Sequence, residues 1–315
     1  TDSNGYIYVV GYHISNGYQI SIGSGKYLPS TGSSQDAFVV KYSASGGTLW
    51  GKSVPTNISS QAIGVQVDSS GNVFAAGTYR TSDYPALGNG QYLMSASNNT
   101  AFLIKYNSNG DAQWASAPAE GDGKSTVVDS NGNVYITGNY SSSSTINLGG
   151  PGSPTLPSTS GTRTFVIKYD TGGTAQWAKM INTSSTSYNT GVATDSSGNV
   201  YMTGYYYSTS SVSLGNSVTL PATSHQDGYV IIYDTSGIAQ GSINVSGTSS
   251  LSPTITSYGI AVDSNRNIIL GGQMNGLINS ALDIGNSVSL TRSTTYNPYG
   301  VTTVGFVIKY ATQSS

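Results

Sequence analysis

Short apolar segments separated by turn residues run through the whole chain. Segments such as residues 133–138 (NVYITG) and 164–169 (TFVIKY) are rich in Val, Ile, Tyr and Phe, and Gly, Asn, Asp and Ser bound them. This length and composition predict β-strands joined by turns. No stretch has the 3.6-residue periodicity of a long amphipathic helix.

The segments recur as one unit, repeated five times. Each unit contains a turn, typically Asp-Ser-x-Gly, that is followed by its second strand; Asp favours such turns and Gly supplies the positive φ that they need. The turns begin at Asp2, Asp68, Asp129, Asp195 and Asp263. They predict a structural role for these aspartates, in preference to calcium binding, because the spacing of a calcium loop is absent.

Two further strands follow in each unit. The third strand ends in a tyrosine, and the outer strand after it carries a tryptophan in three units and Gly241 in the fourth. The tyrosines are Tyr42, Tyr106, Tyr169, Tyr233 and Tyr310; the tryptophans are Trp50, Trp114 and Trp177. A patterned connection between the second and third strands predicts an extra hairpin or flap. An inner strand before the turn completes four strands in most units.

Repeated four-stranded units are typical of propeller blades. We therefore predict an all-β, five-bladed β-propeller with four-stranded antiparallel blades. The solenoid alternative would need shorter, more regular repeats. The chain 1–315 is predicted to be a single domain with repeats at approximately 1–53, 54–117, 118–180, 181–245 and 246–315; these are called repeats 1 to 5 below.

The repeat resembles that of the bacterial and archaeal secreted β-propeller repeat family. Residues 191–204 (GVATDSSGNVYMTG) and 165–177 (FVIKYDTGGTAQW) are similar to the pattern of that family. The resemblance implies the propeller fold and an extracellular location. It implies no particular activity, because fold alone does not give function.

The two terminal repeats are each one strand short. Repeat 1 begins at its turn and lacks an inner strand, whereas repeat 5 stops after its third strand and lacks an outer one. Exposed strand edges invite pairing with other chains. We expect either an incomplete sequence or a strand supplied by another segment or an identical subunit, beside residues 6–10 or residues 306–310.

The amino-acid composition limits the kinds of partner that the chain can bind. Only 8% of residues are charged and the net charge is −2, which argues against a nucleic-acid surface, since such a surface needs clustered Lys and Arg. No apolar run is long enough to span a membrane. There are no cysteines. The uncharged polar, Tyr-rich composition is typical of secreted or cell-surface proteins.

Candidate catalytic groups are few. Most aspartates belong to turns, and Glu120 and Asp122 share one Gly-rich loop in which solvated carboxylates are more usual than a catalytic pair. His13 and His225 are expected at the rim, and two histidines without cysteine do not indicate a metal site. We predict no enzymatic activity, no catalytic residues, no metal and no cofactor.

Ligand-binding candidates come from the tyrosines that follow the glycine of the second strand and are expected near a rim. Aromatic rings beside Asn and Ser suit a sugar or a protein surface. The candidates are Tyr12, Tyr79, Tyr140, Tyr205, Tyr206 and Tyr207. Sequons for N-glycosylation occur at Asn57, Asn98, Asn139, Asn182 and Asn244.

These observations favour a non-enzymatic extracellular or cell-surface protein with a structural or adhesive role, such as a component of an appendage or envelope layer. The alternative is a lectin-like propeller that binds carbohydrate through the rim tyrosines. The expected partners are other surface proteins, identical subunits or glycans.

Overall fold

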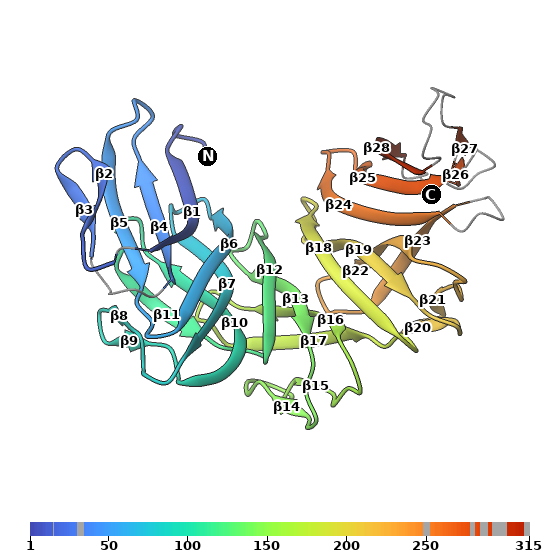
Figure 1. Cartoon of the computed structure of the whole chain (residues 1–315), viewed down its shortest axis with the longest axis horizontal. Coiled ribbons are helices and arrows are strands. Elements are labelled where there is room, and N and C mark those ends of the chain that lie inside the picture. Colours follow the sequence, from blue (N-terminus) through green and yellow to red (C-terminus); the bar gives the residue numbers. More distant parts are fainter. Residues whose placement is uncertain are drawn as a thin grey trace. The chain divides into compact units, whose positions relative to one another are not determined.

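The computed structural model describes residues 1–14, 16–29, 35–247, 253–277, 281–283, 289–291 and 301–311. Every regular element in these residues is a β-strand (Figure 1). The chain divides into two compact units. The first unit is Thr1–Ser158 with Val166–Ala178, and the second is Thr159–Phe165 with Lys179–Ser315. No described helix is long and apolar enough to cross a membrane.

Repeats 1 and 2 form one sheet in the first unit. Its order is β1-β4-β6-β7-β10-β11, and β5 lies outside this order and also pairs with β4. Repeat 1 contributes β1 (Ile7–Ile14), β4 (Gln35–Tyr42) and β5 (Thr48–Val54). Repeat 2 contributes β6 (Ser59–Val67), β7 (Val73–Thr81), β10 (Ala96–Tyr106) and β11 (Ala112–Ser116). The two repeats are joined by a single parallel pair, Gln35 with Ser59, so each is an antiparallel sheet of its own.

Repeat 3 is a four-stranded antiparallel sheet in the order β12-β13-β16-β17. Its strands are β12 (Gly121–Val128), β13 (Val134–Tyr140), β16 (Arg163–Tyr169) and β17 (Ala175–Ile181). The division between the two compact units falls within β16 and β17.

Repeats 4 and 5 lie in the second unit. Repeat 4 contains β18 (Thr186–Thr194), β19 (Val200–Tyr207), β22 (Asp227–Tyr233) and β23 (Ala239–Gly247), paired in that order. Repeat 5 contains β24 (Thr254–Val262), β25 (Ile268–Leu277) and β28 (Val301–Tyr310), also paired in that order. The first and last repeats thus have three strands each among the described residues, as the sequence predicts.

A small hairpin follows the second strand of each repeat, which confirms the predicted extra element. The hairpins are β2 (Ile20–Gly23) with β3 (Lys26–Leu28), β8 (Ala86–Gly88) with β9 (Gln91–Tyr92), β14 (Ile146–Asn147) with β15 (Thr155–Leu156), β20 (Val212–Gly215) with β21 (Val218–Leu220), and β26 (Ala281–Asp283) with β27 (Ser289–Thr291). Gly23 and Gly215 turn two of them with φ of 92° and 90°, a conformation that glycine adopts without steric cost.

The cores lie between neighbouring sheets. In the first unit, Val39 of β4, Phe102 and Tyr106 of β10 and Trp50 of β5 share one buried cluster. In the second unit, a cluster combines repeats 4 and 5, including Val230 and Leu270. Alternate residues of each strand enter these cores, as the period-2 pattern requires. The all-β fold with antiparallel four-stranded sheets is confirmed, whereas the number of blades and the single domain remain predictions.

Candidate functional site

The six candidate tyrosines fall into two sets, because successive side chains of a strand point to opposite faces of the sheet. Tyr79, Tyr140 and Tyr206 are at most 1% exposed. Tyr12 is 49% exposed, while Tyr205 and Tyr207 are half-buried. The three buried tyrosines therefore cannot offer their rings to a ligand at the surface, as the prediction of ligand binding requires.

The buried tyrosines hold the small hairpins in place. The hydroxyl of Tyr79 donates to the Met94 carbonyl oxygen at 2.9 Å, that of Tyr140 to the Pro157 carbonyl oxygen at 2.8 Å, and that of Tyr206 to the Pro221 carbonyl oxygen at 2.9 Å. Each acceptor lies one or two residues beyond the second strand of a hairpin. The repeated Gly-x-Tyr pattern in these repeats is thus structural.

The remaining tyrosines belong to two different compact units. Tyr12 lies in the first unit, and Tyr205 and Tyr207 lie in the second. Tyr205 stacks on Tyr188 with ring centroids 5.1 Å apart and planes at 23°. Partial burial, followed by the neighbouring phenols of Tyr188 and Tyr258, raises the pKa of Tyr205. Tyr258 was not among the candidates, although it is 52% exposed.

The turn aspartates have the structural role that the sequence predicts. In Asp68, Oδ1 accepts the backbone N–H groups of Ser70 and Asn72 at 2.9 and 2.8 Å, and Oδ2 accepts the Asn72 amide at 2.7 Å. The same bonds recur at Asp129, Asp195 and Asp263. At Asp263, the bond from the Asn267 amide and the Lys309 ammonium at 3.0 Å hold the pKa at about 2.

Two buried aspartates stand at equivalent positions of the third strand. Asp36 directly precedes β4 residues Ala37 and Phe38, and Asp227 opens β22 in the same register. Oδ1 of Asp36 accepts the Thr56 backbone N–H at 2.7 Å. Burial raises the pKa of both carboxyls against the opposing effect of their hydrogen bonds. We interpret both residues as ties between strands.

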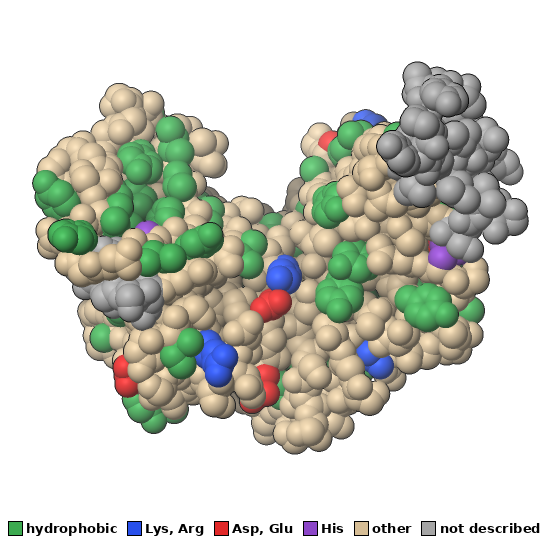
Figure 2. Space-filling view, viewed as in Figure 1, with side chains coloured by type: hydrophobic (Ala, Val, Ile, Leu, Met, Phe, Trp, Pro, Cys, Tyr) green, Lys and Arg blue, Asp and Glu red, His purple; other side chains and the backbone are tan. Residues whose placement is uncertain are grey.

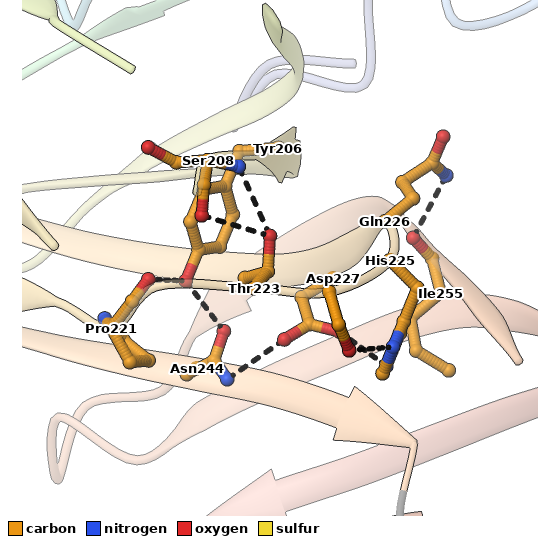
Figure 3. A network of polar contacts seen from close by, with 10 residues as sticks. Tyr206, Ser208, Pro221, Thr223, His225, Gln226, Asp227, Asn244 and Ile255 are labelled. Atoms are coloured by element: carbon orange, nitrogen blue, oxygen red, sulfur yellow. Dashed lines mark hydrogen bonds and ion pairs between the residues drawn. The ribbon is translucent and has the colours of Figure 1, made fainter. Parts of the chain in front are cut away.

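Asp227 belongs to a connected polar network in repeat 4 (Figure 3). The Asn244 amide donates to Asp227 Oδ2 at 3.0 Å, and its own oxygen lies 3.0 Å from the Tyr206 hydroxyl. His225 Nε2 lies 3.1 Å from Asp227 Oδ1, and its Nδ1 is 3.0 Å from the Ser224 hydroxyl. Through Tyr206, the network connects Pro221, which follows the hairpin, with Asn244 of the outer strand β23.

The other candidate acids and His13 occupy separate environments. Asp122 forms an ion pair with Lys124 at 3.0 Å, whereas the exposed Glu120 accepts the Asn98 amide at 3.3 Å. Their distinct partners give no support to a catalytic pair. His13 is only 9% exposed, which corrects its expected place at the rim, and burial lowers its pKa. Its Nε2 lies 3.2 Å from the Ser53 hydroxyl.

The five sequon asparagines differ in access. Asn139 is 5% exposed, so it is a poor acceptor in the folded chain. The Asn244 side chain is engaged in the network of Figure 3, and Asn57 accepts two hydrogen bonds through its amide oxygen. Asn98 and Asn182 are exposed. Glycosylation at these two sites stays a prediction.

Comparisons with known proteins agree with the repeat structure. Residues 176–205 match the family model described as Beta-propeller repeat. An uncharacterized WD repeat-containing protein of Acanthamoeba polyphaga mimivirus is 29% identical over 185 residues. That match covers 50% of this chain and 13% of the viral protein.

Two solved structures are similar at low sequence identity. One is a protein of unknown function from Dyadobacter fermentans, with 11% identity, a TM-score of 0.44, and coverage of 93% of this chain and 80% of that one. The other is a gluconolactonase of Xanthomonas campestris, with 11% identity, a TM-score of 0.34, and coverage of 82% and 70%. The sequence match at residues 176–205, which span most of β17, all of β18 and most of β19, identifies this part of the chain as a β-propeller repeat.

Proposed function

We propose that the chain is a non-enzymatic structural or adhesive protein of the cell exterior, and that its five repeats are the blades of one β-propeller. The composition supports an exterior location, because uncharged polar side chains dominate and charged ones are sparse on the face that Figure 2 shows. The hydrogen bonding of the turn aspartates supports a non-enzymatic role, because their carboxylates accept bonds from the backbone of their own turns.

An assembly role is supported by the edge of β1 that faces away from β4, where the other repeats have an inner strand. β1 pairs with β4 on one side and ends its sheet among the described residues. The corresponding strands β7, β13, β19 and β25 each pair with an inner strand on that side. Ile7, Val9 and Ile14 of β1 are 38%, 39% and 50% exposed. Such an apolar, unpaired edge is a template for strand addition.

Gly11 supports an inner strand at this edge. Gly77, Gly204 and Gly272 lie opposite the aromatic residue of the third strand, and Gly11 has the same register opposite Phe38. At Gly77, Gly204 and Gly272 a Cβ would collide with an inner-strand carbonyl oxygen. At Gly11 it would meet only Phe38 ring atoms, at 3.1 Å. β1 thus has the glycine that a bulged inner strand requires, although none of the described residues forms such a strand beside it.

The partner is an extended segment with the sequence pattern of the chain's own inner strands. These strands all carry a register shift at the same place, between Ala62 and Gly64 in β6 and between Asn189 and Gly191 in β18. A segment of this pattern would satisfy the backbone edge of β1 and cover its apolar side chains. Supplied by another subunit, it would link chains head to tail.

A peptide tests this role. A synthetic peptide of residues 59–68 should bind the chain saturably in isothermal titration calorimetry, and a peptide with proline at the position of Val65 should not, because it lacks a backbone N–H. Gly11→Ala should abolish binding, since its methyl group would occupy the place of the peptide carbonyl. Gly241→Ala is the control, because a Cβ there meets only Ile232, at 3.8 Å.

Equal binding of the peptide to Gly11→Ala and to the unchanged chain would overturn the proposed docking at β1. The exterior location is tested separately by protease treatment and antibody labelling of intact cells. Protection of the chain in intact cells, with cleavage only after lysis, would contradict a surface protein.

Lectin-like binding is the second candidate, favoured by the aromatic group in the second unit. The Tyr188–Tyr205 stack and the exposed Tyr258 offer rings on which a sugar face can pack. Glycan-array binding that Tyr258→Ala abolishes would support it, and array binding unaffected by that change would contradict it.

A further inference from the structure

A cavity of about 370 Å³ lies in the first unit, beside the hairpin of repeat 2. Its lining includes Tyr79, Ala117 and Glu120, together with Ser144 and Ile146 of repeat 3. All of its lining residues belong to the first unit.

The cavity exists because repeat 2 has small side chains where repeat 4 has the network of Figure 3. In repeat 4, Asn244 lies opposite Tyr229, at the position that Ser53 takes opposite Phe38 in repeat 1. In repeat 2 the register of β10 with the outer strand ends at Leu103 opposite Ser116, and its continuation by one residue puts Ala117 at this position.

The third strand shows the same substitution of a small side chain for a larger one. Thr100 stands where repeat 4 has Asp227, each two residues before the aromatic residue of the strand. The Tyr79 hydroxyl is bonded to the Met94 carbonyl oxygen, as Tyr206 is to Pro221, so the hairpin is held in the same way. The space that Asn244 and Asp227 fill in repeat 4 is left open in repeat 2.

Glu120 lines this space, and its backbone is fixed by two contacts. Its backbone forms a bridge with Thr100, and its carbonyl oxygen accepts the Ser141 N–H at 3.4 Å. Its Oε2 accepts the Asn98 amide at 3.3 Å. Oε1 has no hydrogen bond from the described part of the chain, so this oxygen of a lining residue is free to accept one.

The lining combines three kinds of groups. Ser95, Ser97 and Ser144 bring hydroxyls, which both donate and accept. Glu120 brings the acceptor oxygen, and Met94 with Ile146 bring apolar surface. No Lys or Arg belongs to the lining. A neutral polyol with a C–H face matches all three, and a cation would use only the carboxylate, whose attraction is weak at an exposed position.

We infer that this cavity is a binding site for a short neutral saccharide. The Glu120 carboxylate accepts hydrogen bonds from sugar hydroxyls, the serines complete the polar contacts, and the Met94–Ile146 surface packs on the ring. This site would supply the adhesive part of the proposed function, but it does not depend on strand addition at β1 or on the tyrosines of the second unit.

The test uses the full chain and a panel of neutral oligosaccharides: maltotriose, cellotriose, chitotriose and mannotriose. Saturation-transfer NMR identifies binders, and calorimetry measures their affinities. Ala117→Asn installs the residue that repeat 4 carries at this position and should weaken binding at least about tenfold by filling the cavity. Glu120→Gln should weaken it by about tenfold, the effect of one hydrogen bond to a charged group. Asp83→Asn is the charge-matched control, since Asp83 is an exposed acid of the first unit outside the cavity.

Binding that Ala117→Asn and Glu120→Gln weaken, but Asp83→Asn does not, supports the site. The inference is overturned if no saccharide of the panel binds, if binding is unchanged in Ala117→Asn, or if ethanolamine binds in the cavity more tightly than every sugar. Gly11→Ala should leave saccharide binding unchanged. Loss of peptide binding and loss of sugar binding therefore report on the two proposals separately.

Discussion

The indole N–H of Trp50 donates to the carbonyl oxygen of Ser108 at 3.0 Å, so the outer strand of repeat 1 is tied to the outer turn of repeat 2. Trp114 makes the same bond to Thr171 in repeat 3, at 3.2 Å. Each indole also lies against the third-strand tyrosine of the next repeat, with Trp50 at 6.1 Å from Tyr106. Trp50 and Trp114 are thus contacts through which one repeat packs on the next.

Trp50→Ala should lower the free energy of unfolding by about 3–5 kcal/mol, the usual cost of emptying a buried aromatic site. Trp50 is 9% exposed, and its neighbour Leu49 is 41% exposed. Leu49→Ala is therefore the matched control and should have a small effect. Urea unfolding followed by tryptophan fluorescence and circular dichroism measures both. A loss below about 1 kcal/mol in Trp50→Ala would mean that the indole does not pack between repeats.

Gly173→Ala should be more destabilising than Gly90→Ala, although both glycines have positive φ, of 84° and 72°. The left-handed backbone costs an alanine about 1–2 kcal/mol at either site. At Gly173 the added Cβ would also lie 2.6 Å from the Trp114 ring, whereas at Gly90 nothing lies within 4 Å. Melting temperatures of the two variants give the comparison. Equal losses would show that the Trp114 ring moves aside freely.

The sequence predicts the strands and turns well because the same sequence pattern recurs in every repeat. The sequence-based prediction fails for the candidate tyrosines. They were chosen because they follow the glycine of the second strand, and this choice combines residues whose side chains point to opposite faces of the sheet. In repeat 4, Tyr205 and Tyr206 are adjacent in sequence, yet Tyr206 is fully buried and Tyr205 is not. Aligning the repeats places Tyr79 and Tyr140 with Tyr206, which is the signal that could have separated them.

The cavity of repeat 2 could not be predicted from the sequence patterns, for a different reason. It depends on small residues, Ala117 and Thr100, and such residues carry no chemical signature on their own. Only the registers of β10 and β22 show that larger side chains occupy these positions elsewhere. Glu120 was noticed as an unusual acid, but its place at the cavity follows from the bridge to Thr100, which joins residues 20 positions apart.

Tyr206→Phe should lower stability by about 1–3 kcal/mol, the cost of leaving buried polar groups without a partner. The hydroxyl lies 2.9 Å from the Pro221 carbonyl oxygen and 3.0 Å from the Asn244 amide oxygen, and the variant leaves both acceptors without it. Tyr258→Phe removes a hydroxyl from a side chain that is 52% exposed and should have almost no effect. Denaturant unfolding of the pair tests this, and a harmless Tyr206→Phe would show that water replaces the hydroxyl.

Asp227 and Asp263 should titrate on opposite sides of the ordinary aspartate pKa of 3.8. Burial raises the pKa of Asp227 despite the Asn244 amide and His225, so its proton binds more tightly in the folded state. Its contribution therefore destabilises the fold as pH rises through the raised pKa. Hydrogen bonds and Lys309 lower the pKa of Asp263 to about 2. Its contribution is present above pH 3.8 and is lost as pH falls toward 2.

Carbon-detected NMR of the aspartate carboxyl groups can follow both titrations, and Asp227→Asn and Asp263→Asn assign the two signals. Asp227 should be the first of the two to take up a proton on acidification. Protonation of Asp263 before Asp227, or a shared titration midpoint, would contradict the burial of Asp227 and the hydrogen bonding of the Asp263 carboxylate in its turn.

Gly204 and Gly11 have the same register in repeats 4 and 1. At Gly204 a Cβ would meet the Tyr188 carbonyl oxygen well inside van der Waals contact, because β18 bulges toward it. Backbone cannot yield as a side chain can, so Gly204→Ala should separate β18 from β19 and strongly lower the melting temperature. At Gly11 the Cβ faces only the Phe38 ring, at 3.1 Å. Gly11→Ala should therefore have a much smaller effect on the chain alone. Adding the peptide of residues 59–68 should raise the melting temperature of the unchanged chain and leave that of Gly11→Ala where it was, because only a glycine at this position leaves room for the added strand. If Gly11→Ala without peptide is as damaging as Gly204→Ala, then β1 already has an inner strand against it, and the free edge on which the assembly role rests does not exist.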